Sequence, residues 1–338
     1  MSSLSRPPGH PFAIAAVLAL AVGATGCTPS ATSPAPGTPL TVGLGFIPSV
    51  QFAPFYLAQQ AGYYRDAGLE VTFQNKIDPD LITLVGQGAV DIGSADGTSV
   101  IPAVSQGIPV VYVATIYSTY PSIVFAKASS GIATAADLEG KRIGIPGRYG
   151  SSWIMLQALL LSAGLTPDDV EIVEYPDFGQ GAAVAQGAVD AATGFANNEP
   201  VQLALSGAEV SVLHVDDIVP LPGPGLVAGR ATLETKGEAI RAFIAATLRA
   251  MREIAADPDT GLEAAIDAVP ELADARDAQR AILEATIGTW SADSDAAAFG
   301  AIDPAGWDAS LRFMTSLGLV PNPVTVDDLV DDSFLPRE

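Results

Sequence analysis

Short apolar runs alternate along the chain with longer stretches that have the character of helices. Runs rich in β-formers at 40–45 and 142–145 are each followed by a turn rich in Gly, Pro or Ser, and then by helical stretches at 54–67 and 152–163. Strands that alternate with helices in units of about 30 residues are typical of parallel sheets with right-handed crossovers. The pattern therefore predicts an α/β protein.

The second part of each unit repeats almost residue for residue. The segment 85–91 (VGQGAVD) returns 99 residues later as 184–190 (VAQGAVD), and 67–69 (AGL) returns as 163–165 (AGL). The glycine of each Ala-Gly-Leu stands where the end of a helix needs a residue with positive φ. The repeat favours two similar lobes, each a doubly wound, mostly parallel sheet, over a single large sheet.

Ligands of doubly wound sheets bind beyond the carboxyl ends of the strands, so two facing lobes place both sets of loops around one cleft. Three short apolar runs are candidates for hinge strands: 111–115, 122–126 and 226–229. The helical remainder, 233–317, is expected to pack on the first lobe. The predicted division is lobe 1 at 40–122 plus 229–338 and lobe 2 at 123–228.

The first 39 residues differ in composition from the rest. An apolar run of small residues, 12–26, ends at Cys27; it is too short to span a bilayer and has the length of a signal-peptide core. The small residues before Cys27 resemble a bacterial lipobox. We expect 1–26 to be a lipoprotein signal peptide, Cys27 to carry the lipid anchor on the extracytoplasmic face of the membrane, and 27–39 to be a flexible tether. The alternative is a free thiol near an ordinary cleavage site.

The net charge limits the classes of partner that the protein can bind. The net charge is −22, with 16 Lys and Arg against 38 Asp and Glu. Nucleic acid is excluded as a partner because phosphate contacts need clustered cations. Cys27 is the only cysteine, so neither an internal disulfide nor a cysteine zinc site can form. We expect no metal, no cofactor and a monomer.

Several motifs together identify a family. They are GFIPSVQFAPFYLA at 45–58, AGYY at 61–64, AGLEV at 67–71, GQG at 86–88, DIG at 91–93, GKRIG at 140–144 and NEP at 198–200. This combination resembles the ABC-importer solute-binding family for thiamine pyrimidine precursors, sulfonates and nitrate, over residues 40–230. The resemblance implies the two-lobed type II periplasmic-binding fold, with a small molecule held in the cleft and delivered to a membrane permease with its ATPase.

Two motifs bear on the ligand. Asn198-Glu199-Pro200 resembles the branch that binds pyrimidine precursors of thiamine, and the pattern P-x-x-Q-F-A-P-F-Y from Pro48 resembles riboflavin-binding proteins. Phe46 stands in the region where the pyrimidine branch usually carries Trp. The resemblance implies a small aromatic nitrogen heterocycle. Hydroxymethylpyrimidine or formylaminopyrimidine comes first, riboflavin is an alternative, and sulfonates, taurine and nitrate follow.

In the first lobe, the candidate contacts stand in loops after predicted strands. Phe46 and Phe52 can stack on an aromatic ring or belong to the core. Asp96 can accept hydrogen bonds from a ring amine or imide, or cap the following helix. The candidates of this lobe are Phe46, Pro48, Gln51, Phe52, Ser94, Asp96 and Tyr117.

The second lobe offers equivalent loops. The segment 146–153 opens a helix, where backbone amides and hydroxyls can hold an anion or a carbonyl oxygen. Glu199 can accept from an exocyclic amine and a ring N–H together, or serve as a first-turn helix charge. The candidates here are Arg148, Tyr149, Ser151, Ser152, Asn198 and Glu199.

An enzyme is the rival class. Eukaryotic pyrimidine synthases of the same fold need a reactive His, a Lys for pyridoxal phosphate and a Cys-rich motif. Beyond Cys27 this chain has one histidine, His214, within a strand-like run, and no further cysteine. We therefore predict a binding protein without catalytic residues. A purely structural surface lipoprotein is disfavoured because it would not require a duplicated cleft.

Overall fold

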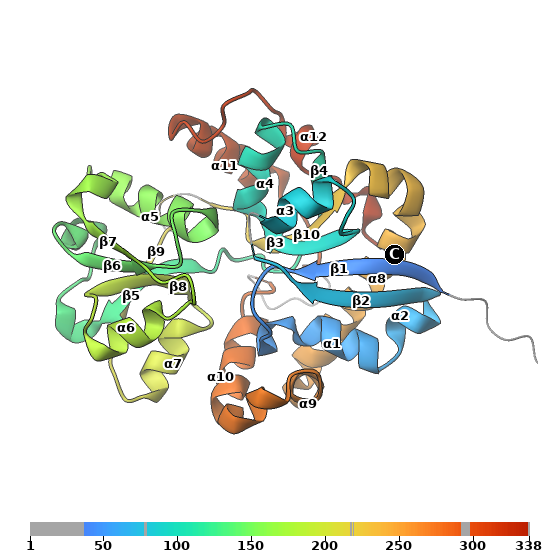
Figure 1. Ribbon diagram of the computed structural model, residues 1–338, viewed down its shortest axis with the longest axis horizontal. Coiled ribbons are helices and arrows are strands. Elements are labelled where there is room, and N and C mark those ends of the chain that lie inside the picture. Colours follow the sequence, from blue (N-terminus) through green and yellow to red (C-terminus); the bar gives the residue numbers. More distant parts are fainter. Residues whose placement is uncertain (1–36, 78–79, 217, 219, 292–297, 337–338) are drawn as a thin grey trace, which may run out of the picture. The chain divides into compact units, whose positions relative to one another are not determined.

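The computed structural model describes residues 37–336 apart from 78–79, 217, 219 and 292–297. The predicted signal peptide, Cys27 and most of the tether lie outside the described residues. The described strands form two five-stranded sheets (Figure 1). They are β1 (Thr38–Leu44), β2 (Leu69–Asn75), β3 (Ile92–Asp96), β4 (Val110–Thr115), β5 (Ser122–Lys127), β6 (Arg142–Ile145), β7 (Glu171–Glu174), β8 (Ala191–Phe195), β9 (Val210–His214) and β10 (Pro224–Gly229).

The two sheets share one plan. Their strand orders are β2-β1-β3-β10-β4 and β7-β6-β8-β5-β9. In the first sheet β10 alone runs antiparallel to its neighbours, and in the second β5 does so. The remaining described strands of each sheet run parallel, as the alternation of strands and helices predicts.

The aspartate that ends each copy of the repeat ties neighbouring strands together. The backbone N–H of Thr41 in β1 donates to Asp91 Oδ2 at 2.8 Å, and the N–H of Arg142 in β6 donates to Asp190 Oδ2 at 2.9 Å. Each carboxylate also pairs with a cation: Lys236 Nζ lies 2.8 Å from Asp91 Oδ1, and Arg142 Nη2 lies 2.9 Å from Asp190 Oδ1. The aspartate that the two copies of the repeat share thus has the same structural role in each sheet.

Helices cover both faces of the sheets. The described α-helices are α1 (Ala53–Gln60), α2 (Tyr63–Asp66), α3 (Asp80–Gly86), α4 (Gly97–Ser105), α5 (Gly150–Ser162), α6 (Gln180–Gln186), α7 (Glu199–Leu205), α8 (Arg230–Ala256), α9 (Pro258–Ala268), α10 (Arg276–Ile287), α11 (Pro304–Ser316) and α12 (Val326–Leu329). The predicted helix at 54–67 is wrong as one element: Gly62, with φ 79°, separates α1 from α2. Gly68 and Gly164 have φ 75° and 73°, which confirms the predicted positive-φ positions.

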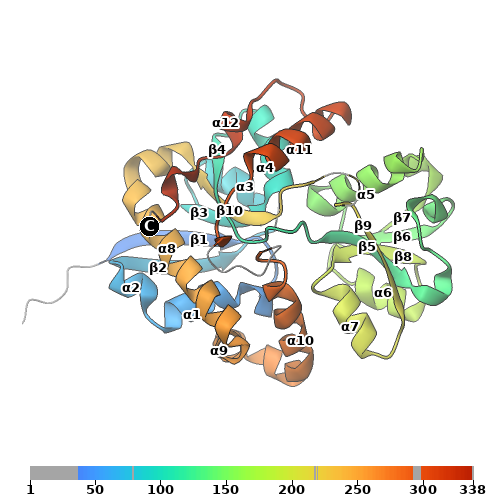
Figure 2. The same cartoon turned by 180° about the vertical axis from the view of Figure 1, so that it is seen from behind.

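The first sheet is buried between two helical layers. Along β4, Val111 and Val113 pack with residues of α1, α8 and α9, whereas Val110 and Tyr112 pack on the opposite face with α3, α4 and α11. This alternation follows from the two-residue period of a strand. Figure 2 shows α8 running across the first sheet toward α9. Helices that follow β10 in the chain therefore contribute to both of these layers.

The chain passes from the first sheet to the second between β4 and β5, and returns between β9 and β10. The sequence-based boundary at 228/229 leaves most of β10 in the second lobe, whereas β10 pairs with β3 and β4 in the first sheet. Its apolar residues Leu226 and Val227 are fully buried there, one on each face. We therefore propose that the second lobe ends before residue 224.

Among the described residues, no helix combines the length and apolar character needed to cross a bilayer.

Candidate functional site

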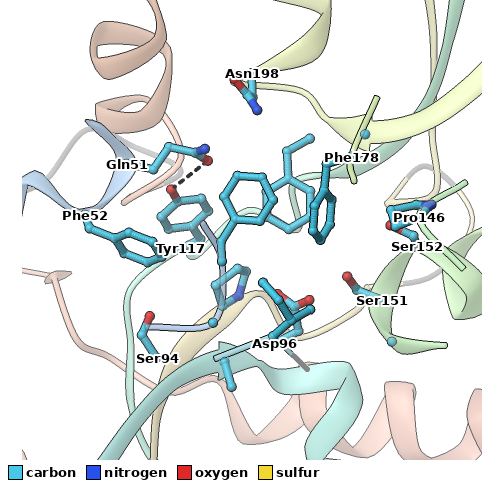
Figure 3. Close-up of a pocket in the computed structure, with 18 of the residues that line it drawn as sticks. Gln51, Phe52, Ser94, Asp96, Tyr117, Pro146, Ser151, Ser152, Phe178 and Asn198 are labelled. Atoms are coloured by element: carbon cyan, nitrogen blue, oxygen red, sulfur yellow. Dashed lines mark hydrogen bonds between the residues drawn. The ribbon is translucent and has the colours of Figure 1, made fainter. Parts of the chain in front are cut away.

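A cleft lies between loops at the carboxyl ends of strands from both sheets (Figure 3). It contains about 990 Å³ of space outside protein atoms, part of it open to solvent. The first sheet contributes the ends of β1, β3 and β4, and the second contributes the ends of β6, β7 and β8. This is where a doubly wound sheet places its ligand.

Aromatic rings form much of the lining. They are Phe46, Phe52, Phe55, Tyr117, Tyr149, Phe178 and Phe195. Phe46 and Phe178 come from different sheets and meet edge to face, with ring centroids 4.9 Å apart and planes at 82°. Phe52 and Phe55 also belong to the core of the first sheet, so both interpretations of Phe52 apply.

Asp96 ends β3 and immediately precedes α4. Its side chain makes no capping hydrogen bond to that helix, so the predicted alternative of a helix cap is wrong. Burial raises the pKa of Asp96 to about 6, against the opposing effect of a hydrogen bond from Ser151 on the second lobe. A partly desolvated carboxylate in the cleft suits a ligand that donates hydrogen bonds.

Glu199 is the second carboxylate of the cleft and begins α7. Its Oε2 accepts a hydrogen bond of 2.8 Å from the backbone N–H of Phe195, and burial raises its pKa to about 6. Gly194 makes room for it, because a Cβ there would lie 2.8 Å from Oε2. Glu199 therefore lines the cleft and also bonds to the loop that it follows.

A buried polar network joins the two sheets at the cleft. Asn197 Nδ2, in the loop after β8, donates to Gln51 Oε1 at 2.9 Å and to Thr286 Oγ1 at 2.8 Å. Tyr117 Oη donates to the same Gln51 oxygen at 3.4 Å (Figure 3). Burial raises the pKa of Tyr117 well above its usual range, so the phenol remains protonated as a donor. Gln51 and Thr286 hence contribute to holding the lobes together, and Tyr117 donates to Gln51 from within the first lobe.

Most of the predicted contacts line the cleft. They are Phe46, Gln51, Phe52, Ser94, Asp96, Tyr117, Tyr149, Ser151, Ser152, Asn198 and Glu199.

Two predicted contacts are not among the lining residues. Pro48 is exposed. Arg148 turns away: its Nε lies 3.4 Å from Glu174 Oε1 and its guanidinium lies over the ring of Trp153. In place of a cleft contact, Arg148 therefore makes an ion pair with Glu174 and a cation–π contact with Trp153.

Phe178 and Gln180 are lining residues that the sequence analysis missed. Phe178 stands in the loop from β7 to α6 and Gln180 is the first residue of α6, in a segment that carries no recognisable motif. Equivalence with the other strand ends was the available signal, because residues just after a parallel strand of the second sheet face the same cleft.

The lining has a one-sided charge. Of the described residues that form it, Asp96 and Glu199 are acidic, and none is Lys, Arg or His. In the part of the chain that the structure describes, no cluster of three or more His, Cys, Asp or Glu is arranged to hold a metal ion.

The fold is the two-lobed periplasmic-binding fold. A solved structure with this fold, the alkanesulfonate-binding protein SsuA from Xanthomonas axonopodis pv. citri bound to MOPS, has a TM-score of 0.65 and 20% identity, and the match covers 90% of this chain and all of that one. Residues 49–261 match the NMT1/THI5-like family, and the chain belongs to that family.

Proteins whose sequences are similar to this chain have different functions. The riboflavin-binding protein RibY of Chloroflexus aurantiacus is 35% identical over 88% of this chain and 86% of its own length. The formylaminopyrimidine-binding protein of Halalkalibacterium halodurans is 26% identical over 84% and 87%. The 4-amino-5-hydroxymethyl-2-methylpyrimidine phosphate synthase of Aspergillus parasiticus is 28% identical over 64% and 67%.

Proposed function

We propose that this protein is the solute-binding component of an ABC importer and that it captures an uncharged, flat nitrogen heterocycle, with riboflavin as the first candidate. The cleft supports a binding role because aromatic rings from both sheets converge on it together with a few polar groups. Flat rings gain about 0.5–1.5 kcal/mol per favourable aromatic contact beyond burial.

The observation that carries the choice of ligand is the charge of the lining. Two carboxylates and no cationic side chain stand among the described lining residues. A sulfonate or nitrate would have to leave water for a site without a cationic partner, which costs several kcal/mol. A heterocycle with N–H donors instead gains charge-assisted hydrogen bonds. This argues against sulfonates, taurine and nitrate.

Riboflavin ranks ahead of the pyrimidines, which the sequence placed first. Four aromatic side chains of the lining, Phe46, Tyr149, Phe178 and Phe195, are at least partly exposed, and a fused ring system can contact more of them than a single pyrimidine ring can. The relative of 35% identity is a riboflavin-binding protein, whereas the formylaminopyrimidine-binding relative is 26% identical. A thiamine pyrimidine precursor is the second candidate, supported by Glu199 in its Asn-Glu-Pro motif.

The positions of lysine and histidine favour binding over catalysis. His214 lies exposed on β9, and Lys236 is paired with Asp91 outside the cleft. No described lysine is among the lining residues, so the cleft offers no amine for a Schiff base. The proposal also includes a lipid anchor on Cys27, a permease with its ATPase as partner, and an extracytoplasmic location.

Calorimetric titration of the purified protein with riboflavin, hydroxymethylpyrimidine, formylaminopyrimidine and taurine tests it. The proposal expects riboflavin to bind most tightly and to raise the unfolding free energy by about 2.7 kcal/mol at a hundred times its Kd. Taurine binding with no response to the heterocycles would contradict it.

A further inference from the structure

Phe178 has a backbone conformation that large side chains rarely adopt. Its φ is 60°, and it is the one non-glycine residue with positive φ in the part of the chain that the structure describes. A β-carbon is crowded in this left-handed region. Strain of this kind persists where the surrounding structure fixes it, and it concentrates at ligand-binding sites.

The ring of Phe178 lies in the cleft. The side chain is half-buried, lines the cleft and meets the edge of Phe46 from the other sheet. It is not among the described side chains that pack into the cores of the second sheet. Figure 3 shows it on the side of the cleft opposite Gln51 and Phe52. The strained backbone therefore presents an aromatic surface to the cleft.

Gln180 lies two residues further along and holds an unpaired acceptor. Its side chain is 1% exposed and lines the cleft. Nε2 donates to the backbone oxygen of Thr193 at 3.4 Å, which fixes the amide so that the other atom is Oε1. Oε1 has no hydrogen-bond partner among the described residues. A buried acceptor without a partner is costly, and so it calls for a donor.

We propose that the segment from Phe178 to Gln180, where the loop after β7 enters α6, determines ligand specificity. Phe178 packs on the flat ring of the ligand, and Gln180 Oε1 accepts a hydrogen bond from a ring N–H. The ligand class is thereby narrowed to planar heterocycles with a ring N–H donor, such as the imide of an isoalloxazine. This inference rests on the proposed function, because it concerns the same cleft.

A pair of ligands that differ only in that donor tests the role of Gln180. Riboflavin carries the imide N–H, and 3-methylriboflavin carries a methyl group in its place. We expect the wild-type chain to bind the methylated flavin at least about tenfold more weakly, because the acceptor is then left unpaired. Gln180→Leu should bind both flavins alike, and Gln180→Glu, which keeps an acceptor, should restore discrimination.

The outcomes distinguish the role of Gln180 from the proposed function as a riboflavin-binding protein. Wild-type discrimination that Gln180→Leu retains in full would overturn the role of Gln180 and leave the proposed function standing. Failure of the wild-type chain to bind either flavin would reject riboflavin as ligand and this inference with it. Circular dichroism and melting of each variant establish that it is folded. Gln180→Met is a second apolar replacement if Gln180→Leu does not fold.

Two replacements of Phe178 distinguish the contribution of its ring to ligand binding from the effect of its strained backbone on stability. Phe178→Ala loses the ring and keeps a β-carbon at positive φ, whereas Phe178→Gly loses both. We expect both to weaken riboflavin binding about tenfold. Without ligand, Phe178→Gly should melt about 2–4 °C above Phe178→Ala. Leu205→Ala, an exposed apolar residue of the same lobe outside the cleft lining, is the control and should leave binding unchanged.

Wild-type affinity in either Phe178 variant would overturn the role of the ring. Equal melting temperatures of the alanine and glycine variants would overturn the claim that the conformation is strained.

Discussion

At the scale of single residues, the cleft depends on two carboxylates and on loops that present aromatic rings. Asp96 and Glu199 were predictable because each follows a short strand of the repeat, and the carboxyl ends of such strands meet at one edge. The position of Phe178 just after β7 indicates that it lies near the cleft, but sequence does not assign to phenylalanine the positive φ that presents its ring there. Arg148 was misplaced because its long side chain reaches a local carboxylate instead.

Glu199→Gln tests the charge of the second carboxylate. The amide oxygen can still accept from the Phe195 N–H, so the loop should keep its structure. Riboflavin affinity should fall about tenfold to hundredfold, since a charge-assisted hydrogen bond contributes about 1.5–3 kcal/mol. Calorimetry of the variant gives the ratio, and unchanged affinity would remove Glu199 from the ligand contacts.

The raised pKa values of Asp96 and Glu199 predict a pH dependence of stability. Both values lie near 6, above the ordinary 3.8 and 4.5, so the folded state binds these protons more tightly than the unfolded state. Their contribution to stability is full below about pH 4 and is lost as pH rises through about 6. The double variant Asp96→Asn, Glu199→Gln should therefore gain stability relative to wild type as pH rises from 4 to 7, by about 2 kcal/mol per group.

Urea unfolding of both chains across that pH range measures the difference. A difference that stays constant with pH would show that the two groups have ordinary pKa values in the folded protein.

At the scale of elements, the loops after strands join the two sheets. The sequence pointed to Asn198 in the motif Asn-Glu-Pro, whereas its neighbour Asn197 is the residue that is buried and bonded across the cleft. Sequence pattern locates the loop but not which of two adjacent asparagines turns inward, because that depends on the partner side chains of the other lobe. Helix ends show the same limit, since Gly62 divides a stretch whose composition reads as one helix.

We expect Asn197→Ala to shift the protein toward an open arrangement, in which the two lobes lie further apart. The change removes the donor shared by Gln51 and Thr286, so the ligand-free protein should have a larger radius of gyration in small-angle X-ray scattering. Affinity for each ligand should fall by one common factor, about tenfold, because closure is then less populated. Asn198→Ala, in which the cross-lobe bonds remain, serves as the control for compactness.

A change in selectivity among ligands without any change in scattering would contradict this role of Asn197.

Asp91→Ala tests the structural role of the repeat. The carboxylate accepts from the Thr41 N–H and pairs with Lys236, so its loss leaves a part-buried donor and a cation without their partner. We expect a loss of about 2–3 kcal/mol of stability with riboflavin affinity unchanged. Unfolding in urea together with calorimetry of the folded variant checks both, and a selective loss of binding would contradict a purely structural role.

At the scale of the whole molecule, the α/β class, the two similar sheets and the position of the cleft followed from the repeat and from the alternation of strands and helices. The pairing of β10 within the first sheet did not follow from the sequence pattern. The antiparallel strand that completes the first sheet comes from a segment more than a hundred residues after the rest of that sheet, and local pattern carries no information about such pairing. The charge of the cleft lining also lay beyond sequence pattern, because it depends on which charged side chains reach the cleft.

The central claim is that the cleft holds an uncharged, flat nitrogen heterocycle. Native mass spectrometry of the protein with the ligand that co-purifies tests it most directly, because it identifies the occupant without a choice of candidates. The account predicts a bound mass equal to that of riboflavin or a thiamine pyrimidine precursor, lost from Glu199→Gln under the same conditions. A bound sulfonate or another anion would contradict the account.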